Sequence, residues 1–251
     1  TILTACHDLM HCKHMGVDQY LYASVLVVLV FYLLPGTPSQ NLETIWAHIK
    51  ENYGTVEVAS RFTNLKLSMF CDAADFEAKM PCLKGRAAEV KGIGAPLLAV
   101  WRLHMHYHSE AIPDTQKQQI EMCLACSLEM ETTLKQHANF IRLPREEYTS
   151  FRRCGFVLLC CFNALGYHFS SVCSPAKKLF DITIKAHCLG RCILNAEFIN
   201  PRLAWCYSGE HYMFHIRRLL AKCCFHLSPS KATVKFAKQY RLGMHILYEQ
   251  M

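Results

Sequence analysis

The sequence predicts a mainly α-helical domain with one or two short strands. Of its 251 residues, 52% are hydrophobic and 19% are charged, which is typical of a chain that folds around a core and excludes a disordered tail. Apolar residues recur at helical spacing in several long segments. Nine prolines and eleven glycines are too few for a collagen-like or low-complexity chain.

The apolar pattern orders the expected elements along the chain. The short apolar segment Ile2–Cys6 is expected to be a strand, and an extended piece is expected at Leu65–Phe70. Ser39 or Asn41 is expected to cap the helix that follows the first break. The expected helices are Gly16–Leu34, Leu42–Gly54, Gly85–Trp101, Thr115–His137, Pro144–Leu165, Leu179–Phe198, Glu210–Phe225 and Ser230–Leu247.

The most apolar segment is Tyr20–Leu34, and its length decides between a core helix and a membrane span. It has 15 residues, whereas a spanning helix needs about 18–20. Polar residues stand just before it and Pro35-Gly36 ends it. The sequence therefore predicts a buried core helix and no membrane partner, and no secretory signal is recognised.

Fifteen cysteines are present, an odd number, and many lie inside apolar runs such as Leu158–Phe162. Cysteines in such runs are typical of small buried side chains in a reducing compartment, so a nuclear or cytoplasmic location is expected. The pair Cys123-x-x-Cys126 lies on a helical apolar pattern, which favours core packing over redox chemistry.

The densest set of metal-ligand residue types lies near the N-terminus. Structural zinc sites pair two close ligands with two distant ones at set spacings, and this set does not match such a spacing, so zinc is not expected. The alternating histidines His104, His106 and His108 lack an evident third ligand. The N-terminal set consists of Cys6, His7, His11, Cys12 and His14.

Positive charge gathers at the C-terminal end. The formal net charge is +7, and residues 211–251 contribute seven basic residues against Glu249, which leaves +6 in that segment. Phosphate contacts come mainly from lysine and arginine, so the pattern indicates an anionic partner, DNA above all, against the alternative of a solvated helix face. The basic residues are Arg217, Arg218, Lys222, Lys231, Lys235, Lys238 and Arg241.

Two carboxylates lie in contexts suited to phosphoryl transfer. Asp8 follows the expected first strand, and Glu210 opens a helix that becomes strongly basic. Enzymes that cleave phosphodiesters hold divalent ions on shared carboxylates. Spacing alone favours the simpler roles of a helix cap and a first-turn charge. The sequence lacks the glycine-rich phosphate loop and the serine-hydrolase motif, so nucleotide hydrolysis and serine-hydrolase chemistry are not supported.

Four blocks, taken in order, resemble the catalytic region of CACTA-type (En/Spm-like) cut-and-paste transposases. The blocks are Asp8-Leu9-Met10-His11, Leu83-Lys84-Gly85-Arg86-Ala87, the stretch Phe180–His187, and Glu210 with its preceding aromatic residues, Arg217-Arg218 and Ser228-Pro229. Their order and approximate separations agree with that family.

The resemblance implies the C-terminal part of an RNase H-like core with a large helical insertion. Asp8 and Glu210 would bind Mg²⁺, and His187 would lie near the site. Residues 1–34 would end the core, 35–200 would form the insertion, and 201–251 would be basic helices that hold transposon ends, all within one domain. Arg202 would join the DNA-binding residues above.

This chain departs from the family pattern because the first catalytic aspartate should lie on an earlier strand. A complete site would need that part of the protein from elsewhere, so whether the chain is an enzyme stays open. The resemblance predicts a transposase-like DNA-processing fragment, with a homo-oligomer as a further possibility. The alternative is a non-catalytic helical module that binds nucleic acid or protein.

Overall fold

The structure, a computed structural model, describes residues 7–55, 60–107, 109–110, 112–173, 175–207, 216–221 and 228–249. The chain divides into two compact units, Thr1–Trp205 and Cys206–Met251. The predicted single domain 1–251 has its basic segment beginning at residue 201, close to the boundary between the units.

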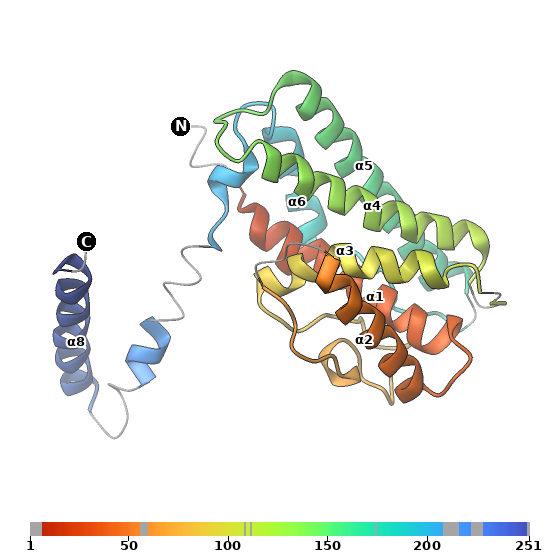
Figure 1. Cartoon of the computed structure of the whole chain (residues 1–251), viewed down its shortest axis with the longest axis horizontal. Coiled ribbons are helices and arrows are strands. Elements are labelled where there is room, and N and C mark those ends of the chain that lie inside the picture. Colours follow the sequence, from red (N-terminus) through yellow and green to blue (C-terminus); the bar gives the residue numbers. More distant parts are fainter. Residues whose placement is uncertain are drawn as a thin grey trace. The chain divides into compact units, whose positions relative to one another are not determined.

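The first unit is a bundle of helices, drawn from red to light blue in Figure 1. The longest of them are α4 and α5, which lie side by side as an antiparallel pair. The helices of the first unit are η2 (Met10–Val17), α1 (Asp18–Val28), η3 (Leu29–Leu33), α2 (Pro38–Thr55), η4 (Leu67–Met69), α3 (Ala87–His104), α4 (Asp114–Gln136), α5 (Arg145–Tyr167), η5 (His168–Val172), α6 (Ile184–Asn195) and η6 (Pro201–Ala204).

The core is built around the helical run formed by η2, α1 and η3. Every residue of α1 except Tyr20 is buried, so the predicted buried helix is confirmed. Helix α3 packs against α1, η2 and η3, while α6 packs on η2 and α2 packs on η3. A helix that is apolar all round must be covered on every side, and the bundle provides that cover.

Helices α1 and α3 approach closely at a glycine. A Cβ added at Gly94 would lie 2.6 Å from the hydroxyl oxygen of Tyr22. The missing side chain therefore leaves room for the buried Tyr22 ring against the backbone of α3. Any larger residue at position 94 would push the two helices apart.

Helix α2 is capped at a different residue from the one expected. The Thr37 hydroxyl accepts from Gln40 N at 3.4 Å, and the Gln40 side chain accepts from Thr37 N at 3.0 Å. This reciprocal pair is a capping box, so Thr37 is the cap and Ser39 is not. Asn41 lies inside the first turn, where its buried amide donates to the carbonyl oxygens of Val30 (2.8 Å), Leu34 (3.0 Å) and Gly36 (3.0 Å).

The mainly helical class is confirmed, but the strands are not found in the part of the chain that the structure describes. The expected strand Ile2–Cys6 lies outside the described residues. The extended piece expected at Leu65–Phe70 was wrong, because Met69 N donates to Lys66 O at 2.9 Å and the segment closes into the short helix η4. The RNase H-like core remains a prediction.

Two helical runs are long and apolar enough to cross a membrane by length and composition, Met10–Leu33 and Arg145–Val172. The first is 83% buried and forms the core described above, which is the arrangement expected of a central helix in a bundle. The second is 28% buried, and its outer side carries exposed Arg152 and Arg153. The expectation of no membrane partner agrees with this arrangement.

The second unit contains α8 (Pro229–Glu249) and the short helical stretch 216–221 among its described residues. The helix predicted at Ser230–Leu247 is therefore confirmed. Pro229 begins α8, where its missing N–H leaves no helical hydrogen bond unmade.

Candidate functional site

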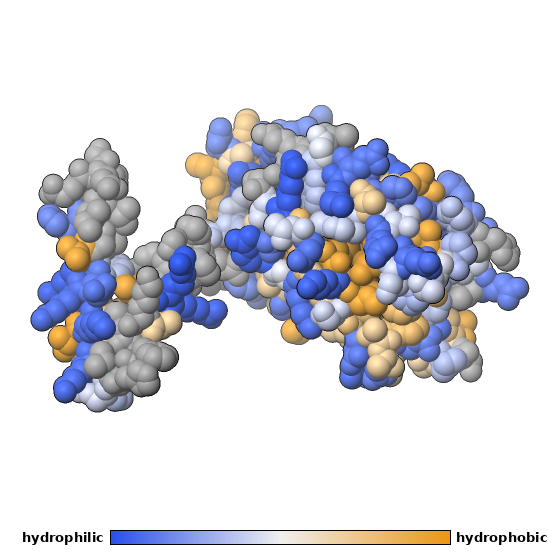
Figure 2. Space-filling model, turned by 60° about the horizontal axis from the view of Figure 1, so that its bottom comes forward, coloured by the Kyte–Doolittle hydropathy of each residue, from blue (hydrophilic) through white to orange (hydrophobic). Residues whose placement is uncertain are grey.

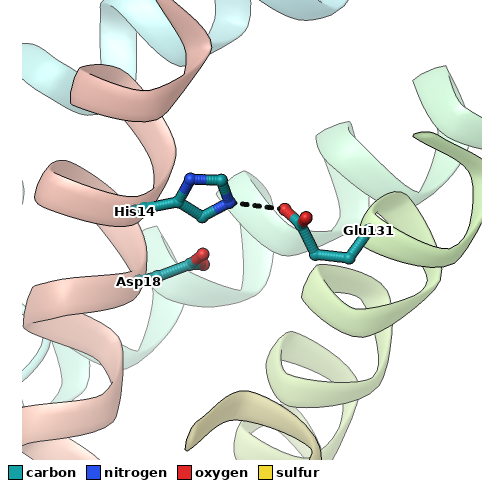
Figure 3. Close-up of side chains that lie close together, drawn as sticks. All are labelled: His14, Asp18 and Glu131. Carbon is teal, nitrogen blue, oxygen red and sulfur yellow. Dashed lines mark hydrogen bonds and ion pairs between the residues drawn. The ribbon is translucent and has the colours of Figure 1, made fainter. Parts of the chain in front are cut away.

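The first unit contains a network of charged side chains within its core. Lys13 and His14 come from η2, Asp18 from the start of α1, and Ser127 and Glu131 from neighbouring turns of α4. Lys13, His14, Asp18 and Ser127 are at most 1% exposed, and the Glu131 side chain is 12% exposed. Figure 3 shows His14 and Asp18 on one helical run facing Glu131 on another.

The Lys13 ammonium lies at the centre of this buried network. Its Nζ lies 2.8 Å from Asp18 Oδ2 and 2.9 Å from Glu131 Oε1, and it donates to Ser127 Oγ at 2.8 Å. Ser127 in turn donates to the second oxygen of Asp18 at 2.8 Å. All three ammonium hydrogens thus have acceptors, which a buried lysine requires.

Two further side chains, His14 and Lys91, complete the network on the Glu131 side. His14 Nε2 lies 2.7 Å from Glu131 Oε1, the contact dashed in Figure 3, and Lys91 Nζ lies 3.0 Å from Glu131 Oε2. Burial by itself would raise the pKa of Glu131, but Lys13, His14 and Lys91 hold it well below its usual range. Glu131 is therefore ionised at neutral pH.

Lys13 is not a base for Ser127. Burial by itself would lower the pKa of Lys13, but Asp18 and Glu131 raise it above its ordinary value. A lysine must be neutral to take a proton from a serine hydroxyl. Lys13 is charged and fully buried, and its contacts join η2 and α1 to α4.

Three side chains of the same network are of types that can bind a metal ion. His14, Asp18 and Glu131 offer ligand atoms within 4.8 Å of one another. The Lys13 ammonium, however, already binds both carboxylates, and Lys91 adds a second positive charge. A Mg²⁺ ion would have to displace a cation that the protein supplies, and it prefers oxygen ligands to imidazole. These residues do not fit Mg²⁺.

Asp8 lies at the start of the first helix, in the role that spacing alone favoured. Its Oδ1 accepts from Met10 N at 3.0 Å, its backbone oxygen accepts from Cys12 N at 3.1 Å, and its Oδ2 pairs with His11 Nδ1. The first two contacts define a helix cap. The Asp8 side chain is 17% exposed.

Glu210, the expected partner of Asp8, lies outside the described residues. The predicted Mg²⁺ site formed by these two carboxylates therefore stays a prediction. His187 is exposed on α6, the helix whose other side packs on η2. The structure thus places two of the three expected catalytic side chains in the first unit.

Arg202 occupies a different setting from the other predicted DNA-binding residues. It belongs to η6 of the first unit, and its guanidinium carbon lies 4.7 Å from the centre of the Trp205 ring. Lys91 Nζ also lies 4.7 Å from that ring centre. Arg202 is therefore engaged with an aromatic face in the first unit, whereas the other predicted basic residues belong to the second unit.

Helix α8 carries four of the predicted basic residues on one face. Lys231, Lys235, Lys238 and Arg241 are all exposed, and their spacing of four, three and three residues follows the helical repeat. Acidic side chains are lacking in the helix until Glu249. Figure 2 shows hydrophilic residues along the visible side of α8, at the left, with hydrophobic ones between them.

The opposite side of α8 is apolar. The rings of Phe236 and Tyr240, four residues apart, stack with their centres 6.1 Å apart and an angle of 20° between the ring planes. Ala232, one turn earlier, is 5% exposed. The helix therefore separates a cationic face from an aromatic and apolar one.

Arg217 and Arg218 are exposed in the helical stretch 216–221, whereas Lys222 lies outside the described residues. Together with α8 they give the second unit six exposed basic side chains among its described positions: Arg217, Arg218, Lys231, Lys235, Lys238 and Arg241.

The buried network escaped sequence reasoning. Lys13 and Ser127 are 114 positions apart, and a lysine in the polar stretch His11-Cys12-Lys13-His14 is typical of an exposed segment. The one sequence signal was that the charged residues Lys13 and Asp18 lie on either side of the apolar stretch Met15–Val17. No protein-family model, curated protein or solved structure matches this chain.

Proposed function

We propose that this protein binds nucleic acid, with DNA as the principal partner, through the basic face of α8. The observation that carries the proposal is the set of four exposed cations, Lys231, Lys235, Lys238 and Arg241, on one helix face that is free of acidic residues before Glu249. This is the electrostatic pattern that neutralises a phosphate backbone.

The length of the basic face suits a short stretch of duplex. Ten residues separate Lys231 from Arg241, so the face extends about 15 Å along the helix axis at 1.5 Å per residue. That length corresponds to about four base pairs at 3.4 Å each. One helix of these dimensions fits into or across a groove of B-form DNA.

The chemistry of the face favours binding to the backbone over recognition of bases. Three of the four side chains are lysines, which bind phosphate as point charges, whereas specific base contacts are dominated by arginine and amide side chains. Binding should therefore depend strongly on salt and weakly on sequence. Four phosphate contacts predict a slope of about −3.6 in a plot of log K against log salt concentration.

The test compares two variants with the same change in charge. Neutralising the α8 face by replacing Lys231, Lys235, Lys238 and Arg241 with Gln should abolish most binding to a labelled duplex and flatten the salt slope towards zero. The control replaces four exposed basic residues of the first unit with Gln, namely Lys50, Lys66, Arg145 and Lys178. Equal losses in both variants, measured by fluorescence anisotropy, would show that net charge and not the α8 face binds DNA.

A second proposal follows from the transposase resemblance, namely that the bound DNA is cleaved with the help of Mg²⁺ at Asp8 and Glu210. The observation that favours it is the Asp8–His11 pair, a carboxylate and an imidazole held together at the start of the first helix. When bound, the ion would activate water and stabilise the leaving oxygen.

Cleavage of an end-labelled duplex by the purified chain, with and without Mg²⁺, tests this second proposal. Asp8→Asn and Glu210→Gln should each remove the Mg²⁺-dependent product while leaving DNA affinity within about twofold, because neither residue is one of the four cations of the α8 face. Lack of a Mg²⁺-dependent product from the wild-type chain would leave the nucleic-acid-binding proposal standing and reject the catalytic one.

A further inference from the structure

Helix α5 has a long outer side without charged residues. From Cys154 to Ala176 the sequence contains no Asp, Glu, Lys or Arg. The run Arg145–Val172 is apolar enough to be a membrane-span candidate, yet it is only 28% buried, whereas the core run Met10–Leu33 is 83% buried. Exposed apolar surface of this extent marks an interaction site in a water-soluble fold. The outer side of α5 is therefore a candidate contact surface.

Five residues form a stripe along this outer side. They follow one another at spacings of three, four, three and four positions, which keeps them on one helix face. The opposite side of α5 is buried and packs against α4 and α6, so the stripe is held on a fixed element. The stripe, called the α5 stripe below, consists of Arg153, Phe156, Cys160, Asn163 and Tyr167.

The two ends of the α5 stripe differ in chemistry. Arg153 is exposed at one end, and Tyr167 is 66% exposed at the other. The last carboxylate of α5 is Glu147, which precedes Arg153 by more than one turn. A guanidinium binds favourably to the face of a tyrosine ring. The cationic end of the stripe is therefore complementary to its aromatic end.

The midpoint of the α5 stripe makes this complementarity available to two copies of the chain. Arg153 and Tyr167 each lie seven residues from Cys160, which is about 10.5 Å along the helix axis. A two-fold axis at Cys160 places each Arg153 opposite Tyr167 of the other copy when the helices are antiparallel. The two Arg153 side chains then lie about 21 Å apart along the helix axis, well beyond the Debye length at physiological salt.

The middle of the α5 stripe is complementary in size. Phe156 and Ala164 each lie four residues from Cys160, so the same axis places the ring of one copy opposite the small side chain of the other. The small side chain of Cys160 at the crossing point lets the two helix axes approach closely. Met122 of α4, which is 45% exposed and lies 3.6 Å from Cys161 between their sulfur atoms, widens the apolar surface beside the stripe.

We propose that two copies of this chain associate through the α5 stripe as an antiparallel pair with two-fold symmetry. Each copy presents the same surface, and arginine, tyrosine and phenylalanine are enriched in such contacts. Arg153 and Asn163 favour a protein partner over a lipid surface, because polar side chains cost free energy in hydrocarbon.

Sedimentation velocity of the intact, reduced chain, from about 1 to about 100 μM, measures the association. The wild-type chain should form a dimer. Arg153→Glu and Tyr167→Lys should each weaken the dimer at least about tenfold, because each removes both cation–π pairs. The control Arg142→Glu makes the same charge change at an exposed position outside the stripe and should leave the dimer unchanged. Circular dichroism checks that all variants are folded.

An equimolar mixture of Arg153→Glu and Tyr167→Lys tests the antiparallel register. In a mixed dimer the introduced carboxylate of one chain lies opposite the introduced ammonium of the other, and the second end keeps its original Arg–Tyr pair. The mixture should therefore associate at least about tenfold more tightly than either variant alone. A mixture as weak as its components would overturn the register.

Cross-linking with a short bismaleimide locates the contact. A peptide that joins Cys160 to Cys160 comes from two chains, because each chain has one such residue, and its yield should fall in Arg153→Glu. A wild-type chain that stays monomeric throughout the concentration range would overturn the dimer. Equal dissociation constants for Arg153→Glu and Arg142→Glu would overturn its placement on α5. A monomer that sediments with phosphatidylcholine–phosphatidylserine vesicles would assign the stripe to a lipid surface instead.

Discussion

Lys13 in the first unit and the lysines of α8 in the second unit lie in opposite environments. In the first unit Lys13 is fully buried and has Asp18, Glu131 and Ser127 within 2.9 Å. In the second unit Lys231, Lys235 and Lys238 are exposed on a helix that lacks acidic residues before its last turn. The same side chain therefore joins helices in one unit and presents charge to solvent in the other.

Amino-acid composition therefore does not show whether a lysine contributes to the stability of the fold. A buried ammonium costs several kcal/mol of desolvation, which its partners must offset, so its removal leaves carboxylates buried and uncompensated. An exposed lysine costs little and contributes little to stability. Four predictions test this contrast, in order of expected effect.

The largest effect should come from one substitution made in both units. Lys13→Met should lower the free energy of unfolding of the first unit by about 3–5 kcal/mol, because Asp18 and Glu131 lose the buried charge between them. Lys235→Met should change the free energy of unfolding by less than about 0.5 kcal/mol. Urea unfolding followed by circular dichroism measures both, and similar losses would contradict the contrast.

Neutralising the carboxylate that faces Lys13 should recover part of that loss. Lys13→Met combined with Asp18→Asn should be more stable than the sum of the single changes by about 1.5–3 kcal/mol, because the double variant no longer buries an unpaired carboxylate at position 18. A double-mutant cycle measures this coupling. A value near zero would mean that Asp18 and Lys13 act independently.

Lowering the pH should weaken the α2–α3 contact. His48 Nδ1 lies 3.1 Å from His104 Nε2, and the rings stack. Burial and the neighbouring His48 lower the pKa of His104. The unfolded chain therefore takes up this proton more readily, so stability should be full above about pH 6.5 and fall as the pH drops through the lowered pKa.

The matched variant for this pH dependence is His104→Gln. Its urea midpoint should vary less between pH 8 and pH 5 than that of the wild-type chain. An unchanged pH profile in the variant would assign the effect to another group.

The smallest effect should come from neutralising a single basic residue on α8. Lys238→Gln should reduce the slope of log K against log salt for duplex DNA by about 0.9 and should leave the urea midpoint unchanged. Lys50→Gln, on the exposed side of α2 in the first unit, is the control and should leave the slope as it is. A slope that is equal in the two variants would remove Lys238 from the DNA contact.

The sequence predicted the helices well because each needs only its own pattern. The buried run Gly16–Leu34 and helices α4 and α8 appear close to their predicted bounds, since apolar period and proline positions are local signals. The helix cap at Thr37 was missed because a serine and an asparagine nearby offered the same local signal, and Asn41 was drawn instead to three buried carbonyl oxygens.

The candidate sites divide in the same way. The basic face of α8 could be found from the sequence because its four residues lie within eleven positions of one helix. The Lys13 network could not, because Lys13 and Ser127 are 114 positions apart and lie on different helices.

The sequence by itself determined that this protein is helical, that its most apolar helix lies in the core, and that its C-terminal helix carries positive charge, because these follow from periodicity and composition. The tertiary structure alone decided which charges are buried in pairs. Such pairs depend on how helices distant in the sequence pack together around the hydrophobic core.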